Sequence, residues 1–212
     1  VKFSVVAVPF KKFFYARFPP PSPGSTEPSR DQAIWFHTVG TDQTNDHLEY
    51  ANPDLPDLSH YATIAEGDDV LILHELEGTS HANGVLVRTL PDGEWSRLVP
   101  PGIARHDVLV ADAGGYVVMT DREAPNGRVV RIDGEGTIVD ELVPETGDAI
   151  EFAAAVAGTL VLTRLVEAAH RVDVHELDGT PAGSVDIPGP GTVLGISGRL
   201  EDEIFFLGYH DF

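Results

Sequence analysis

Cysteine is absent from the 212 residues, and methionine occurs only once. Without cysteine the chain can form no disulfide, no thiolate metal site and no cysteine nucleophile, although this absence leaves the cellular compartment open. Long apolar runs are missing as well, and the sequence therefore predicts no membrane-spanning helix. The first residues, VKFSVVAV, lack the layout of a signal peptide and indicate the interior of a longer chain.

Basic residues are scarce, since 14 lysines and arginines stand against 34 aspartates and glutamates, giving a formal net charge of −20. A surface of this charge repels phosphate groups, so we expect no nucleic-acid partner and no anionic membrane as a partner. The charge is explained either by solubility or salt adaptation, or by an acidic field that attracts cationic peptides. The hydrophobic share of 42% is enough for a folded core.

Four prolines recur at nearly even steps: Pro53, Pro100, Pro144 and Pro188 are separated by 47, 44 and 44 residues. Before the last three of them the chain repeats an alternating strand, a turn rich in Asp and Gly, and a second strand, as in GVLVRTLPDGEWSRLVP. A repeat of about 40–50 residues built from short strands is typical of β-propeller blades.

The repeat divides the chain into four full units and one half unit: residues 1–53, 54–100, 101–144, 145–188 and 189–212. No long amphipathic helix is apparent. We therefore predict an all-β fold, a β-propeller fragment of about four and a half four-stranded antiparallel blades. Because propellers close with typically 4–8 blades, the sequence predicts that further blades belong to the ring. The segment FPPPSPGSTEPSRD, residues 18–31, is predicted to be an exposed loop.

Several segments together resemble the propeller of the prolyl oligopeptidase family. They are VKFS, FFYARF, HTVGTDQTNDHLEYANPD, EGTSHANGVLV, TDREAPNGRVVRID followed by ELVPE, and DGTPAGSVDIPGPGTVLGISGRLEDEIFFLGY. The resemblance implies a seven-bladed propeller joined to an α/β-hydrolase domain, whose Ser–Asp–His triad cleaves short peptides after proline. The propeller would cover that active site, and this chain would hold roughly the third to the sixth blades and half of the next.

Two residues are implied by the same resemblance to contact substrate. Phe3 corresponds to the phenylalanine of the family's K-F-S motif, and Thr79 follows the E-G of the second unit. The family more often has a small sulfur-containing or apolar residue at the position of Thr79. Ordinary core packing near a blade edge is the alternative explanation for Phe3. The implied partners are the missing hydrolase domain, the remaining blades and short peptides.

No catalytic or metal-binding set emerges from the residues themselves, and we expect no catalytic residue, metal or cofactor in this chain. Gly195-Ile196-Ser197-Gly198 is one residue short of a nucleophile elbow and is interpreted as a hairpin turn. His74-Glu75 and His175-Glu176 resemble half of a zinc-protease motif but lack the second histidine. The cluster of Asp42, Asn45 and Asp46 lacks calcium-loop spacing and is interpreted as a solvated loop.

Three functions remain open from the sequence. The first is the gating propeller of a prolyl oligopeptidase-like serine peptidase. The second is a stand-alone propeller that acts as a protein-interaction platform, although Trp-Asp and Gly-His signatures are absent. The third is a propeller enzyme or sugar binder, for which no convergent set of polar residues is found. The open blade edges, at 1–8 and 205–207, also predict self-association.

Overall fold

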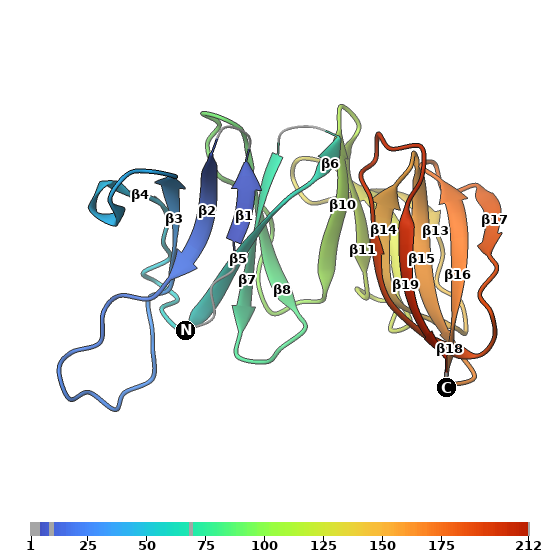
Figure 1. The fold of residues 1–212 in the computed structure, drawn as a ribbon, viewed down its shortest axis with the longest axis horizontal. Coiled ribbons are helices and arrows are strands. Elements are labelled where there is room, and N and C mark those ends of the chain that lie inside the picture. The colour runs from blue at the N-terminus through green and yellow to red at the C-terminus, as the bar shows by residue number, and fades with distance from the viewer. Residues whose placement is uncertain (1–4, 9–10, 68–69, 212) are drawn as a thin grey trace. The chain divides into compact units, whose positions relative to one another are not determined.

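The structure is a computed structural model that describes residues 5–8, 11–67 and 70–211 (Figure 1). Strands form nearly all of its regular structure, and the one helix in these residues is the short 3₁₀ turn η1 (Gln43–Asn45). Two compact units are distinguished: Val1–Ile64 with Val70–Ile103, and Ala65–Asp69 with Ala104–Phe212. No helix in the described residues is long and apolar enough to cross a membrane.

The first unit begins with an antiparallel sheet of four strands in chain order. They are β1 (Val5–Val8), β2 (Lys12–Arg17), β3 (Ala33–Thr38) and β4 (His47–Tyr50). Alternation along β2 places Phe14 and Ala16 on one face, and both are buried. That face lies against the second sheet of the unit.

The second sheet of this unit contains β5 (Leu58–Ile64), β7 (Val70–Glu77), β8 (Asn83–Thr89) and β9 (Ser96–Val99). Phe14 and Ile34 of the first sheet pack with Leu71, Leu73 and Leu86 of the second sheet in one core cluster. Burying each such side chain contributes roughly 1.5–3 kcal/mol. The inner strand β7 is covered on both faces, which explains its nearly continuous apolar sequence.

The second unit begins with a sheet of five strands. Four follow in chain order: β10 (His106–Asp112), β11 (Gly115–Thr120), β12 (Arg128–Ile132) and β13 (Ile138–Val143). The fifth is β6 (Glu66–Gly67), which pairs with β10 in parallel and was not expected from the repeat. Glu66 also accepts a hydrogen bond from the backbone N–H of Leu200, at 2.9 Å.

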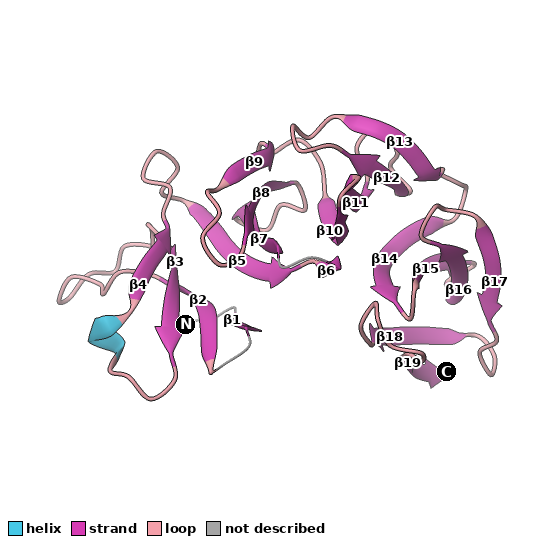
Figure 2. Ribbon diagram, turned by 90° about the horizontal axis from the view of Figure 1, so that it is seen from above, coloured by secondary structure: helices cyan, strands magenta, loops and turns pink. Residues whose placement is uncertain are grey.

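Two further sheets complete the second unit. One has the strands β14 (Ala149–Val156), β15 (Thr159–Val166), β16 (Ala169–Glu176) and β17 (Pro181–Val185), which Figure 2 shows in chain order. The other pairs β18 (Gly191–Ser197) with β19 (Phe206–Asp211). Val193 of β18 packs against Val156, Val161 and Val172, so a core lies between these two sheets.

Five sheets, mostly of four antiparallel strands, confirm the predicted all-β class. One local prediction was wrong: Ser197 is the last residue of β18, paired with Phe206, and does not lie in a hairpin turn. The strand β19 begins only at Phe206, because the Asp202 carboxylate accepts the Arg199 backbone N–H at 2.8 Å and closes a turn before it.

The turn between β16 and β17 depends on glycine for two reasons. Gly179 has a φ of +89°, a conformation that residues with a side chain rarely adopt. A Cβ atom there would also lie 2.0 Å from the carbonyl oxygen of Leu142, the residue before the end of β13. Contact between neighbouring sheets thus selects glycine in the Asp178-Gly179 turn.

Candidate functional site

The two substrate-contact candidates differ in what the structure says of them. Phe3 lies outside the described residues. Thr79 is exposed in the loop that joins β7 to β8, where the Ser80 backbone N–H donates to the Glu77 carbonyl at 3.0 Å. Gly78 before it has a φ of +57°. Thr79 is therefore accessible. The buried polar groups at this end of the sheet lie in the strands next to the β7–β8 loop.

The main feature of that sheet end is the carboxylate of Glu75, which is fully buried two residues before the end of β7. It accepts hydrogen bonds from Arg97 Nη1 at 2.6 Å, Tyr50 Oη at 2.7 Å and Asn52 Nδ2 at 3.0 Å. His60 Nε2 approaches it to 3.7 Å, which is an ion-pair distance rather than a hydrogen bond. The carboxylate thus joins residues of β4, β5, β7 and β9 within the first unit.

Glu75 is held ionised by these contacts. Burial alone would raise the pKa of its carboxyl, but the nearby His60 and the hydrogen bonds from Arg97, Tyr50 and Asn52 outweigh burial and keep the pKa well below the ordinary range. Burial and the bond to Glu75 conversely raise the pKa of Tyr50. A carboxylate with three hydrogen bonds and a very low pKa is a poor general base, so this network supports structure rather than proton transfer.

Because Gly84 of β8 has no side chain, it leaves room for the Glu75 carboxylate. A Cβ atom at Gly84 would lie 3.0 Å from Glu75 Oε2 and 3.0 Å from the ring of Pro101. The close packing therefore fixes where the carboxylate can lie.

His74, the residue before Glu75, belongs to a separate network. Its ring stacks on Tyr61 at 4.4 Å between centroids, Asn83 Nδ2 donates to its Nδ1 at 2.8 Å, and Thr63 Oγ1 lies 3.3 Å from its Nε2. Burial lowers the pKa of His74 to about 4, so the ring is neutral near pH 7. Because Nδ1 of the neutral ring accepts the hydrogen bond from Asn83, Nε2 carries the proton and cannot act as a base toward Thr63.

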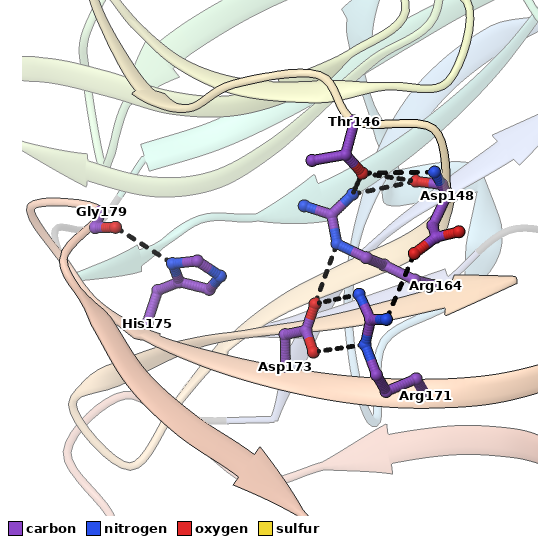
Figure 3. A network of polar contacts seen from close by, with 7 residues as sticks. All are labelled: Thr146, Asp148, Arg164, Arg171, Asp173, His175 and Gly179. Atoms are coloured by element: carbon purple, nitrogen blue, oxygen red, sulfur yellow. Dashed lines mark hydrogen bonds and ion pairs between the residues drawn. The ribbon is translucent and has the colours of Figure 1, made fainter. Parts of the chain in front are cut away.

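The zinc-protease resemblance also fails in the structure. Consecutive residues of a strand point to opposite faces, so His74 and Glu75 cannot converge on one ion. Among residues 5–8, 11–67 and 70–211, no group of three His, Asp or Glu side chains could hold a metal ion. His175 is instead bonded through Nδ1 to the carbonyl of Gly179 at 3.0 Å (Figure 3).

The sheet β14–β17 has an equivalent buried charge in Arg164, two residues before the end of β15 (Figure 3). Its Nε donates to Asp173 Oδ2 at 3.0 Å, and its Nη1 donates to Thr146 Oγ1 and to the Asp148 carbonyl, both at 3.0 Å. The guanidinium therefore fastens β15 to β16 and to the segment that leads into β14.

Arg171 completes this network at the surface. It donates to both carboxylate oxygens of Asp173, from Nε at 2.8 Å and from Nη2 at 3.1 Å, and from Nη1 to Asp148 at 3.2 Å. Burial would raise the pKa of Asp173, but the bonds and charges of Arg171 and Arg164 lower it overall. Two arginines and two aspartates thus neutralise one another at this sheet end.

A histidine links this sheet to the next within the second unit. His170 accepts the backbone N–H of Val193 at Nδ1, at 2.8 Å, which leaves Nε2 to donate to Glu151 at 2.7 Å. The ring therefore bridges β14, β16 and β18. Its partners are a carboxylate and a backbone amide, and neither is a nucleophile.

The acidic residues of the β3–β4 connection form hydrogen bonds with residues close to them in the first unit. Asp42 caps η1 by accepting the Thr44 backbone N–H at 2.8 Å. Asp46 accepts from Tyr15 Oη at 2.5 Å and binds His37 Nδ1 at 2.6 Å. These partners come from the neighbouring strands β2 and β3.

One signal in the sequence points to these networks, which sequence reasoning did not identify. The segments VLILHEL and LVLTRLV each carry a charged residue inside an apolar strand, and a buried charge requires partners. Tyr50, Asn52, Asp148 and Asp173 could not be assigned as those partners, because only the fold brings their strands together.

Comparison with known proteins identifies the family. The family model described as the prolyl oligopeptidase N-terminal β-propeller domain matches residues 1–212. The chain belongs to this family. Its resemblance to that propeller, inferred from the sequence, is thereby confirmed.

Individual relatives support the assignment. Prolyl oligopeptidase ophP from Omphalotus olearius is 25% identical over 217 residues, which cover 95% of this chain and 29% of the relative. Prolyl oligopeptidase A from Galerina marginata is 27% identical over 162 residues, covering 69% of this chain and 22% of the relative. The chain therefore spans less than a third of these prolyl oligopeptidases.

Solved structures agree on the fold. A structure from an analysis of two prolyl endopeptidases and their inter-domain dynamics is 28% identical, with a TM-score of 0.81, covering 94% of this chain and 29% of that one. Prolyl oligopeptidase B from Galerina marginata, without ligand, has a TM-score of 0.83 at 21% identity, covering 95% and 29%. The propeller architecture is thus shared.

Proposed function

We propose that this chain is the propeller portion of a prolyl oligopeptidase-like serine peptidase, and that it covers the active site and restricts access to short proline-containing peptides. The observation that carries the proposal is the family match over residues 1–212. The chain covers only 21–29% of three curated prolyl oligopeptidase relatives, which leaves ample length for a hydrolase domain and the remaining blades.

A propeller that filters substrates by size needs sheet ends that resist distortion, and each polar network stiffens the end of its own sheet. Glu75 and Arg164 each fasten three or more strands or connecting segments at the end of a sheet. Separating a buried charge from its partners strongly destabilises the folded chain. The sheet ends that hold Glu75 and Arg164 therefore resist separation of their strands. Rigid sheet ends would admit a flexible peptide and exclude a folded protein.

Within this function, we assign substrate contact to Phe3 and Thr79. Thr79 supports the assignment by its exposure on the β7–β8 loop, next to the sheet end that Glu75 fastens. An exposed side chain on a loop held by rigid strands can contact a ligand without disturbing the core. The assignment of Phe3 rests on the sequence resemblance alone.

The chain by itself is expected not to cleave peptides. In the part of the chain that the structure describes, Ser197 is exposed at a strand end, and no histidine forms a hydrogen bond with it. A hydrolase of this kind needs a nucleophile, a base and a group that orients the base. The hydrolase domain would supply all three.

The experiment compares peptide selectivity in the full-length protein that carries this chain. Thr79→Trp places a bulky side chain on the exposed β7–β8 loop. It should therefore lower kcat/KM for a long proline-containing peptide more than for a proline dipeptide. Labelling of the hydrolase serine by a covalent probe should stay unchanged. Ser80→Ala on the same loop serves as the control. Equal kcat/KM changes for both peptides, or rapid cleavage of a folded protein by the unmodified enzyme, would contradict the gating role.

A further inference from the structure

The loop between β2 and β3 is the longest exposed segment in the described part of the chain, and the proposed peptidase role does not use it. It contains five prolines, in FPPPSPGSTEPSRD, and every residue from Pro19 to Asp31 is exposed. Figure 1 shows this loop extending away from the strands β2 and β3 that it connects. An exposed segment with this composition has a specific conformational preference.

That preference is the extended polyproline II helix. Proline fixes φ near −65° and has no N–H, so three successive prolines can join neither a helix nor a sheet ladder. Among the described residues, no backbone hydrogen bond engages 18–21. The first one links the Ser25 N–H to the Ser22 carbonyl at 2.9 Å, around a turn with Gly24 at a φ of +78°. Phe18–Pro23 therefore forms a limb whose first four residues make no backbone hydrogen bond and whose last residue, Pro23, begins the turn.

Both ends of the loop are fastened to the first unit. The guanidinium of Arg17 lies 3.8 Å above the ring of Trp35. At the other end, Arg30 donates two hydrogen bonds of 2.6 Å to the carboxylate of Asp57, and the Asp31 N–H donates to the Pro56 carbonyl at 2.8 Å. Anchored ends and stiff prolines lower the entropy lost when such a limb is bound.

We propose that Phe18–Pro23 is a docking segment for a partner protein domain that presents a groove lined by aromatic side chains. In a polyproline II helix, which has three residues per turn, Pro20 and Pro23 would lie on one face and Phe18 and Pro21 on another. The spacing P-x-x-P is the pattern that aromatic grooves read. The unpaired carbonyls of the limb remain available to donors in such a groove. The net charge of −20 favours a groove with a basic rim.

The test uses the complete 212-residue chain, labelled with ¹⁵N, and three purified domains with aromatic-lined grooves: an SH3 domain, a WW domain and an EVH1 domain. Each is titrated into the chain while amide shifts are followed by NMR. At least one should bind with micromolar affinity, with shift changes confined to the β2–β3 loop. The double substitution Pro20→Ala with Pro23→Ala should weaken binding by at least about tenfold.

Pro28→Ala is the matched control, because Pro28 lies in the same exposed loop but outside the limb. It should change the affinity by less than about twofold. All three positions are exposed, so the variants should keep the unfolding midpoint of the parent chain. The proposal is overturned if none of the three domains binds. It is also overturned if the double variant binds as well as the parent chain, or if the shift changes lie outside the loop.

Discussion

At the scale of single residues, buried charges and their hydrogen-bond partners hold strands of this chain together. Glu75 and Arg164 are embedded in apolar strands, and each has at least three partners. The sequence showed that these charges need partners, since an unpaired buried charge is costly. It could not show that Asn52 and Tyr50 serve Glu75, because those residues lie 23 and 25 positions away and meet it only in the fold.

The first prediction concerns Glu75. Glu75→Gln keeps the size of the side chain but leaves the guanidinium of Arg97 without its ionised partner. Breaking a buried pair costs about 3–5 kcal/mol, and the partial exposure of Arg97 suggests the lower end of that range. Urea unfolding measures the loss, and Glu77→Gln, on the exposed end of the same strand, is the control. A loss no larger than that of the control would show that the network contributes little.

The second prediction concerns pH. Burial lowers the pKa of His74 to about 4, whereas an unfolded histidine titrates near 6.5. Between these values the unfolded chain binds a proton that the folded chain does not, so stability must fall as the pH falls through this window. His74→Gln should reduce the slope of unfolding free energy between pH 6.5 and 5. The slope should not vanish, because burial also lowers the pKa of His106.

Urea unfolding at a series of pH values checks this slope. His81→Gln, at an exposed position in the loop that follows β7, should leave it unchanged. If His74→Gln and His81→Gln gave the same slope as the parent chain, His74 would not be a buried neutral group.

At the scale of elements, most strands could be predicted from alternation and turn residues, and the strand order within sheets followed the chain. The Ala-rich β14 is a strand despite the helix propensity of alanine, as its place in the repeat indicates. The parallel strand β6 could not be predicted. Only two residues long, it forms because the segment after β5 meets β10, a contact between residues some 44 positions apart.

The third prediction concerns the turn between β15 and β16. Glu167 and Ala168 both have positive φ, +48° and +66°, as in the type I′ hairpin turn that prefers Asn-Gly. A residue with a Cβ in this region costs about 1–2 kcal/mol, so Ala168→Gly should stabilise the chain by roughly 1 kcal/mol. Ala169→Gly, in the adjoining strand, should destabilise it instead. Thermal unfolding separates the two, and equal effects would contradict the turn assignment.

At the scale of the whole molecule, acidity and apolar exposure oppose each other. The net charge of −20 favours solubility, yet Leu194, Ile204 and Phe206 of the β18–β19 sheet and its turn are 65–70% exposed. Exposed apolar side chains of this size favour burial against another surface. We expect the isolated chain to self-associate through these residues.

The fourth prediction tests that expectation by sedimentation. The parent chain should show a concentration-dependent increase in mass, and Leu194→Glu with Phe206→Glu should restore a monomer by placing charge on the exposed face. Val139→Glu, at an exposed position of β13, is the control and should leave association unchanged. A monomeric parent chain at micromolar concentration would contradict the expectation.

In the proposed function, this chain is the access-restricting propeller of a larger serine peptidase. The most direct measurement is covalent labelling of the intact protein that carries this chain with a serine-directed probe, followed by mass mapping of the labelled peptide. We predict one labelled serine outside residues 1–212 and no labelling of the isolated chain. Labelling of Ser197 or of any other residue within 1–212, or an intact protein without a reactive serine, would contradict the account.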